Sequence, residues 1–118
     1  MDGAFRQLTV SAATAEGVVR PAHAEDLCAG HFPGDPLVPG ASLARLMAAV
    51  AGELVGGAGA EPGVLIRCTF HLRVTPADDI LVSARLGERT ASGADVAAEV
   101  RVRGRCAARA RFRFGTAT

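Results

Sequence analysis

Apolar and polar residues alternate through much of the second half of the chain, and this pattern constrains the fold more than any other feature. Apolar residues occupy every second position in the segments 64–74, 80–86, 96–102 and 106–114. Such alternation is typical of a β-strand that buries one face and exposes the other. Turn-forming residues separate the segments, and Gly104 is one of them. The pattern predicts an antiparallel sheet with one dry face and one wet face.

One long helix is predicted to start after Gly40 and to end at Gly56-Gly57. Its apolar side chains recur at three- and four-residue spacing and form one stripe: Leu43, Leu46, Met47, Val50 and Leu54. A one-sided sheet and a mostly apolar helix bury each other when the sheet wraps around the helix. The chain length of 118 residues indicates one domain, residues 1–118, of the α+β class.

The first part of the chain carries weaker signals. Strands are expected at 5–11 and 17–22, with a turn near 15–17 and a short helical turn at 24–29. Cys68 and Cys106 fall on apolar faces of predicted strands, which favours buried thiols.

Charge and composition narrow the function classes. The net charge of +1 argues against a nucleic-acid binder. The start of the chain has no apolar run behind a basic segment, so a secretory signal is not expected, and no apolar stretch is long enough to cross a membrane. The three cysteines are an odd number without metal-like or redox-like spacing. These features favour a reduced, cytoplasmic setting.

The most informative segment is His31-Phe-Pro-Gly-Asp-Pro-Leu-Val-Pro-Gly40, here called the 31–40 motif, which leads into the predicted helix. It resembles the His-Phe-Pro-Gly-x-Pro-x-x-Pro-Gly signature of the β-hydroxyacyl-acyl-carrier-protein dehydratases. The segment Val74-Thr-Pro-Ala-Asp78, here called the 74–78 motif, resembles that family's Val-x-Pro-Gly-Asp turn, with Ala77 where glycine is usual. The resemblance implies a hotdog fold, in which an antiparallel sheet wraps one central helix, and a substrate carried on an acyl carrier protein.

The implied reaction explains why these residue types are needed. Dehydration of a 3-hydroxyacyl thioester removes a proton from Cα, and the neutral-range pKa of histidine makes His31 the candidate base. The resemblance makes the Gly40 N–H the donor to the thioester oxygen, where a helix N-terminus favours negative charge. Phe32, Asp35 and Arg45 are predicted to line the site. No cofactor is expected because no electrons move, and no metal is expected because no ligand set has the required spacing.

Position 45 departs from the family pattern. The resembling family places its catalytic Glu or Asp fourteen positions after the histidine, and here that position is Arg45. Arginine stays protonated and offers no acceptor, so it cannot replace the acid. Three explanations remain open: a related partner subunit supplies the acid, His31 acts with water or with Asp35 or Glu53, or the chain binds or cleaves thioesters without dehydrating them.

The family resemblance also implies a dimer, because a second subunit completes the site. A homodimer is the simplest expectation, and the missing acid favours a heterodimer with a related hotdog subunit, the interface lying near His31 and the start of the helix. The arginines between Arg101 and Arg113 form a basic stripe. This stripe is either a solvated sheet face that discourages edge aggregation or a docking surface for an acidic carrier protein.

Overall fold

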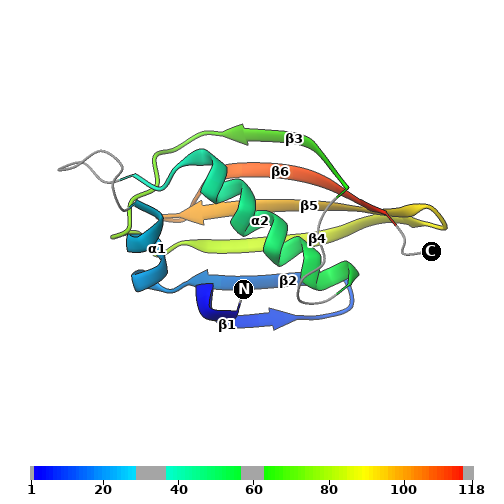
Figure 1. Cartoon of the computed structure of the whole chain (residues 1–118), viewed down its shortest axis with the longest axis horizontal. Coiled ribbons are helices and arrows are strands. Elements are labelled where there is room, and N and C mark those ends of the chain that lie inside the picture. The colour runs from blue at the N-terminus through cyan, green and yellow to red at the C-terminus, as the bar shows by residue number, and fades with distance from the viewer. Residues whose placement is uncertain (1, 29–36, 57–62, 116–118) are drawn as a thin grey trace.

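The computed structural model describes residues 2–28, 37–56 and 63–115. Its elements in chain order are a 3-10 turn (Asp2–Ala4), strands β1 (Phe5–Val10) and β2 (Thr14–Val19), helices α1 (Pro21–Cys28) and α2 (Gly40–Val55), and strands β3 (Val64–Phe70), β4 (Leu81–Thr90), β5 (Gly93–Val102) and β6 (Arg105–Gly115). The six strands form one antiparallel sheet in the order β1-β2-β4-β5-β6-β3. Helix α2 runs diagonally across one face of that sheet (Figure 1). The predicted α+β architecture, an antiparallel sheet around one long helix, is confirmed.

The core lies between α2 and the central strands. The apolar stripe of the helix is buried as predicted from Leu43 to Val50, with Met47 and Val50 fully inaccessible to solvent, while Leu54 at its end is only partly buried. The strand side chains that face it come from the alternating positions of β4, β5 and β6: Val82, Val96, Val100, Ala108 and Phe112. The apolar faces predicted from the alternation in these strands and from the three-to-four spacing in α2 face each other in the structure. The sequence pattern alone was therefore sufficient to predict this core. No helix in the described ranges is both long and apolar enough to span a membrane.

The N-terminal hairpin differs from its prediction. Its turn lies at Ser11–Thr14, not near residues 15–17, because the Ser11 N–H donates to the Thr14 carbonyl (2.8 Å) and the two hydroxyl groups are 2.8 Å apart. Gly17, which suggested a turn, lies inside β2. A Cβ at that position would be 3.0 Å from Cδ1 of Phe5, so the glycine makes room for the buried Phe5 ring.

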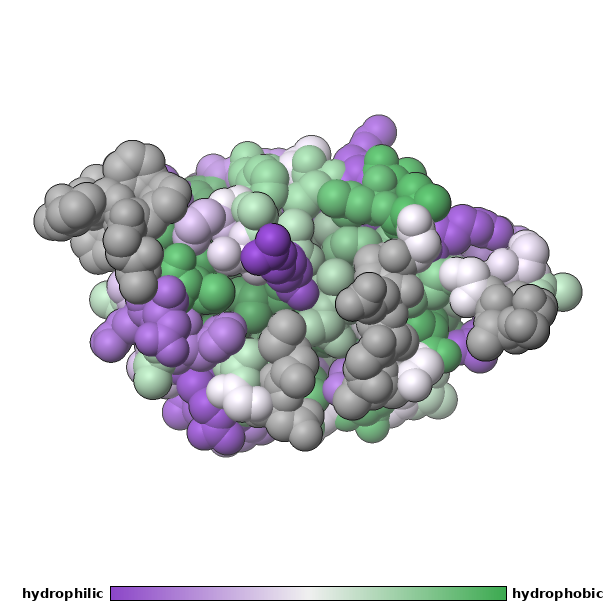
Figure 2. Space-filling view, in the orientation of Figure 1, coloured by the Kyte–Doolittle hydropathy of each residue, from purple (hydrophilic) through white to green (hydrophobic). Residues whose placement is uncertain are grey.

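Strand β3 differs in a second way. It ends at Phe70 instead of continuing to residue 74, and its apolar side chains are about half exposed: Val64, Leu65, Ile66 and Phe70. The reason is position, because β3 is the edge strand beside β6, while α2 packs mainly on β4, β5, β2 and β6. Figure 2 shows hydrophobic side chains gathered at the end of the molecule where β3 begins in Figure 1. The prediction that the alternating residues Val64, Ile66 and Phe70 are buried is wrong for the isolated chain, whereas Val74 is buried as predicted.

The cysteines follow the same distinction between centre and edge. Cys28, at the end of α1, is buried, whereas Cys68 on β3 and Cys106 on β6 are only partly buried. The prediction of buried thiols at the latter two positions is therefore wrong. Both lie where α2 covers the sheet least. Cys68 is on the edge strand β3, and Cys106 is at the start of the neighbouring strand β6.

Candidate active site

The predicted site residues divide between two parts of the chain. His31, Phe32 and Asp35 lie outside the described residues. Gly40 is the first residue of α2, and Arg45 lies one turn further along the same helix with an exposed side chain. The structure therefore describes the thioester-binding end of the predicted site, which is the start of α2 and the segments that hold it.

The start of α2 presents backbone N–H groups. Pro39 is the N-cap, with extended dihedral angles (φ −60°, ψ 148°), and its carbonyl accepts hydrogen bonds from the N–H groups of Ser42 (3.0 Å) and Leu43 (3.1 Å). No side chain caps the helix. The N–H groups of Gly40 and Ala41 have no acceptor within the helix itself, and they lie at the positive end of its dipole. This end of α2 is chemically suited to an oxygen that gains negative charge.

Gly40 is also required by packing. A Cβ at this position would lie 3.1 Å from Cζ of Phe70 and within 3.4 Å of two further ring atoms. The Phe70 ring, at the end of β3, therefore lies directly against the helix start, and it remains 51% exposed. The sequence missed Phe70 as a site residue because alternation assigned it to the core. We add it to the side chains that border Gly40.

The 31–40 motif and the 74–78 motif meet in the structure. The Val38 N–H donates to the Val74 carbonyl at 2.8 Å, two residues before Gly40. The chain that follows β3 is in turn tied to β6, because the N–H groups of His71 (2.7 Å) and Leu72 (3.2 Å) donate to the Ala107 carbonyl. The start of α2 is thus bonded to the segment after β3, and that segment is bonded to β6, the strand next to the β3 edge.

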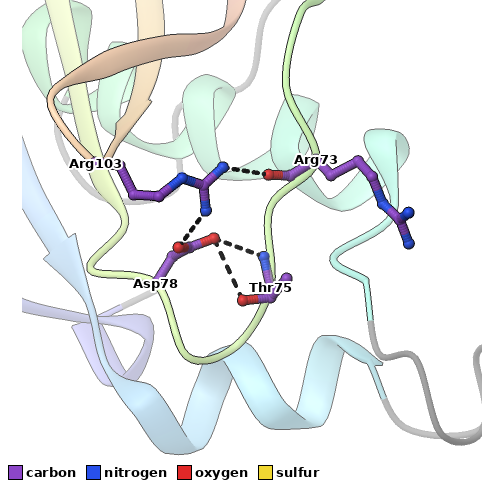
Figure 3. A network of polar contacts seen from close by, with 4 residues as sticks. All are labelled: Arg73, Thr75, Asp78 and Arg103. Carbon is purple, nitrogen blue, oxygen red and sulfur yellow. Dashed lines mark hydrogen bonds and ion pairs between the residues drawn. The ribbon is translucent and has the colours of Figure 1, made fainter.

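A polar network around Asp78 fixes the 74–78 motif (Figure 3). The Asp78 carboxylate accepts hydrogen bonds from the Thr75 N–H (2.9 Å), the Thr75 hydroxyl (3.3 Å) and the Arg103 guanidinium. Arg103 also donates to the carbonyl of Arg73 at 3.1 Å. Arg103 has a positive φ of 51° in the turn between β5 and β6, next to Gly104. The network therefore joins that turn to the chain segment bonded to Val38.

The environment of Asp78 changes its titration. Burial raises the pKa of the Asp78 carboxyl, while the hydrogen bond from the Thr75 N–H and the hydrogen bond and charge of Arg103 lower it more strongly in sum. The net pKa lies below the ordinary aspartate value. A folded-state pKa below the unfolded one means that the ionised group stabilises the fold above the unfolded-state pKa, and that this stabilisation is lost as the pH falls through the folded-state pKa.

Replacing Asp78 with asparagine is expected to lower the free energy of unfolding by about 1–3 kcal/mol at neutral pH, because Arg103 and the Thr75 N–H lose a charged acceptor. The variant is also expected to lose part of the decline in stability at acidic pH. Urea unfolding across the acidic and neutral pH range measures both effects. Asp79→Asn, at the exposed neighbouring residue, is the matched control and should leave stability nearly unchanged. Equal stability of Asp78→Asn and wild type at neutral pH would contradict this assignment.

The position of the missing acid is open to solvent. Arg45 makes no hydrogen bond or ion pair within the described ranges, and its side chain is exposed on α2. Glu53, the acid on the same helix, lies eight residues further along, which corresponds to about 12 Å of helix rise. Glu53 is therefore remote from the helix start that carries Gly40. In the described part of the chain, no group of three or more His, Cys, Asp or Glu side chains is arranged to hold a metal ion.

No protein-family model and no curated protein matches the sequence. Solved structures match the fold closely. The dehydratase heterocomplex ApeI:P from Xenorhabdus doucetiae matches with a TM-score of 0.72 at 17% identity, covering 90% of each chain. The chain has the hotdog fold. Zebra fish thioesterase superfamily member 2 matches with a TM-score of 0.71 at 14% identity, covering 93% of this chain and 80% of that one.

A third similar structure is smu.793 from Streptococcus mutans, bound to acetyl CoA, with a TM-score of 0.73 at 14% identity over 97% of this chain and 92% of that one. The hotdog proteins that resemble this chain thus include a dehydratase complex and a thioesterase superfamily member. At these identities the likeness concerns the fold, and activity has to be argued from the residues of this chain.

Proposed function

We propose that this hotdog protein dehydrates 3-hydroxyacyl thioesters carried on an acyl carrier protein, in fatty-acid or polyketide biosynthesis. The observation that carries the proposal is the arrangement around the start of α2. The 31–40 motif ends there at Gly40, and the hydrogen bond between Val38 and Val74 joins it to the second dehydratase-like motif. A dehydratase complex of the same fold supports the assignment.

The reaction assigns a role to each end of the motif. His31 takes the proton from Cα, and the negative charge that develops on the thioester oxygen is stabilised by the Gly40 N–H and the helix dipole. The Cα–Cβ double bond forms as the β-hydroxyl leaves, and one further proton converts that hydroxyl to water. The products are the trans-2-enoyl thioester and water, so no electrons are exchanged with a cofactor. Phe32 and Phe70 provide apolar surface near the reacting atoms.

The leaving hydroxyl needs a proton, and position 45 of α2, where the resembling family carries its acid, does not supply it here. Arg45 cannot donate it at neutral pH, because its guanidinium does not release a proton there. A second hotdog subunit facing this site would supply the acid from its own central helix. The exposed side chain of Arg45 and the half-exposed apolar edge of β3 are both consistent with a partner in this region. We therefore propose a dimer, formed through β3 and the neighbouring start of α2.

Two alternative functions follow from particular observations. Arg45 in place of the acid favours a subunit that pairs with an active paralogue and contributes no turnover alone, and one similar structure is itself a dehydratase heterocomplex. The likeness to a thioesterase superfamily member favours hydrolysis of the thioester. These functions differ in their products, which makes them separable in one experiment.

The test is incubation of the purified chain with a 3-hydroxyacyl thioester of an acyl carrier protein. Dehydration is expected to give a carrier that is lighter by one water, with no release of free carrier thiol. Release of free thiol and free acid would instead establish a thioesterase. If the wild-type chain is inactive and Arg45→Glu gains dehydration, the missing acid is the defect and the paralogue-partner function holds. Inactivity of both forms, with and without a related active subunit, would refute a dehydratase role.

A further inference from the structure

A groove of about 760 Å³ lies on the sheet and is lined mainly by residues of β2, β3, β4, β5 and β6. Its lining includes the outward positions of these strands, opposite to the side chains that pack on α2: Thr14, Arg67, Arg85, Ala97, Glu99 and Arg111. The proposed dehydratase site at the start of α2 does not use this face. Pockets that bind small molecules typically have volumes of roughly 300–1,000 Å³.

The strand register places three arginines in one line across the groove. Arg85 on β4 lies opposite Ala97 on β5, Ala97 lies opposite Arg111 on β6, and Arg111 lies opposite Arg67 on β3. Directly opposed residues of antiparallel strands project from the same face. We call Arg85, Arg111 and Arg67 the arginine row. Adjacent strands are about 4.8 Å apart, so Arg85 and Arg111 flank the small Ala97 at roughly 10 Å.

The carboxylates of Glu16 and Glu99 line the same groove but do not pair with the arginine row. Within the described ranges, none of its three guanidinium groups makes a hydrogen bond or an ion pair, and all three residues are exposed. Arg67 and Arg111 are moreover directly opposed, an arrangement of like charges that destabilises a sheet. The row therefore concentrates positive charge around the small residue Ala97. A bound anion would reduce the repulsion between these like charges.

Four other arginines of the basic stripe have acidic partners. Arg113 pairs with Asp95 at 2.8 Å, and Arg103 pairs with Asp78. Arg101 (3.5 Å) and Arg109 (3.8 Å) share Glu99, which neutralises the carboxylate next to the row. The stripe noted in the sequence is thus largely satisfied within the protein. Of the stripe's two arginines without an acidic partner in the described part of the chain, Arg105 and Arg111, only Arg111 lines the groove.

We propose that the arginine row binds a ligand bearing phosphate groups, a diphosphate above all. Guanidinium groups match phosphate oxygens in bidentate geometry, and groups on both sides of Ala97 would hold two linked phosphates. The concave shape and the alanine floor favour a small anion as the ligand. An acidic protein would be expected to bind a flatter surface. Diphosphates occur both in nucleotides and in coenzyme A, and the site chemistry is common to the two. The proposal is independent of the dehydration chemistry.

The test is calorimetric titration of the full chain with inorganic pyrophosphate, followed by ADP and coenzyme A. All three are expected to bind, and the affinity should fall as salt is raised because the contact is charged. Arg111→Gln should weaken pyrophosphate binding at least about tenfold, as expected for lost hydrogen bonds to a charged group. The double variant Arg85→Gln, Arg111→Gln should abolish it. Tighter binding of coenzyme A than of ADP, or the reverse, identifies the source of the diphosphate.

The matched control is Arg105→Gln, an exposed arginine on the same strand that does not line the groove. It should bind pyrophosphate like wild type. An equal loss of affinity in Arg105→Gln would show a general charge effect and overturn the proposal, as would the absence of any phosphate binding by the wild-type chain. Binding of an acidic carrier protein that depends on Arg111, without binding of pyrophosphate, would overturn it in favour of a protein-docking surface. Circular dichroism of each variant establishes that the sheet is intact.

Discussion

Replacement of His31 with alanine is expected to reduce dehydration of a carrier-bound 3-hydroxyacyl thioester by at least about 10²–10⁴-fold, the contribution typical of a general base. The proposed mechanism assigns the removal of the Cα proton to this side chain, and the Gly40 N–H cannot perform that step because it only donates. The loss should appear in turnover while the binding of the acyl carrier is retained. Mass analysis of the carrier measures turnover, and titration of the unreacted carrier measures binding.

The matched control is His23→Ala, a partly buried histidine on α1 with no role in the proposed reaction. It should retain most of the wild-type turnover. If the isolated wild-type chain is inactive, both variants are to be measured in complex with a related hotdog subunit. Wild-type turnover in His31→Ala would remove His31 from the mechanism, and with it the main argument for dehydration.

The sequence predicted those parts of the fold in which local pattern and final burial agree. The alternation in β4, β5 and β6 and the spacing of Leu43, Met47 and Val50 in α2 both mark side chains that are buried in the structure. Gly17 and Phe70 show where such reasoning stops. Gly17 leaves room for the Phe5 ring and does not form a turn, and the Phe70 ring lies against Gly40 at an exposed edge. Both contacts join residues whose proximity depends on the tertiary structure.

The contacts that hold the candidate site in place likewise could not be predicted from the sequence. The 74–78 motif was visible as a turn, but its partner Arg103 lies 25 residues away from Asp78, in a different turn. Only the pairing of β5 with β6 and the route of the chain after β3 bring the two together. The arginine row has the same origin, because strand register decides which arginines share a line. Motifs predicted the chemistry of the site, whereas topology determined what holds it.

The second large effect is expected at the edge of the sheet. Ile66→Asp should convert the proposed dimer to monomers, because β3 is an edge strand whose side chains at Val64, Leu65 and Ile66 are about half exposed. Edge strands of this kind offer unpaired backbone groups and apolar surface to another chain. In a two-fold symmetric interface each substitution counts twice. Loss of the burial of two half-exposed isoleucines costs roughly 2 kcal/mol, or about 30-fold in the dimer Kd, and desolvation of two carboxylates adds to this.

Val10→Asp is the matched control, since Val10 is equally apolar and 50% exposed but belongs to β1 at the opposite edge of the sheet. Light scattering across a concentration series should show a dimer for wild type and Val10→Asp and a monomer for Ile66→Asp. Phe70 lies on the same strand and against Gly40, so separation of the subunits would also expose the start of α2. Turnover should therefore fall together with the dimer fraction. A wild-type chain that is monomeric at high concentration and fully active would show that one hotdog subunit completes the site alone.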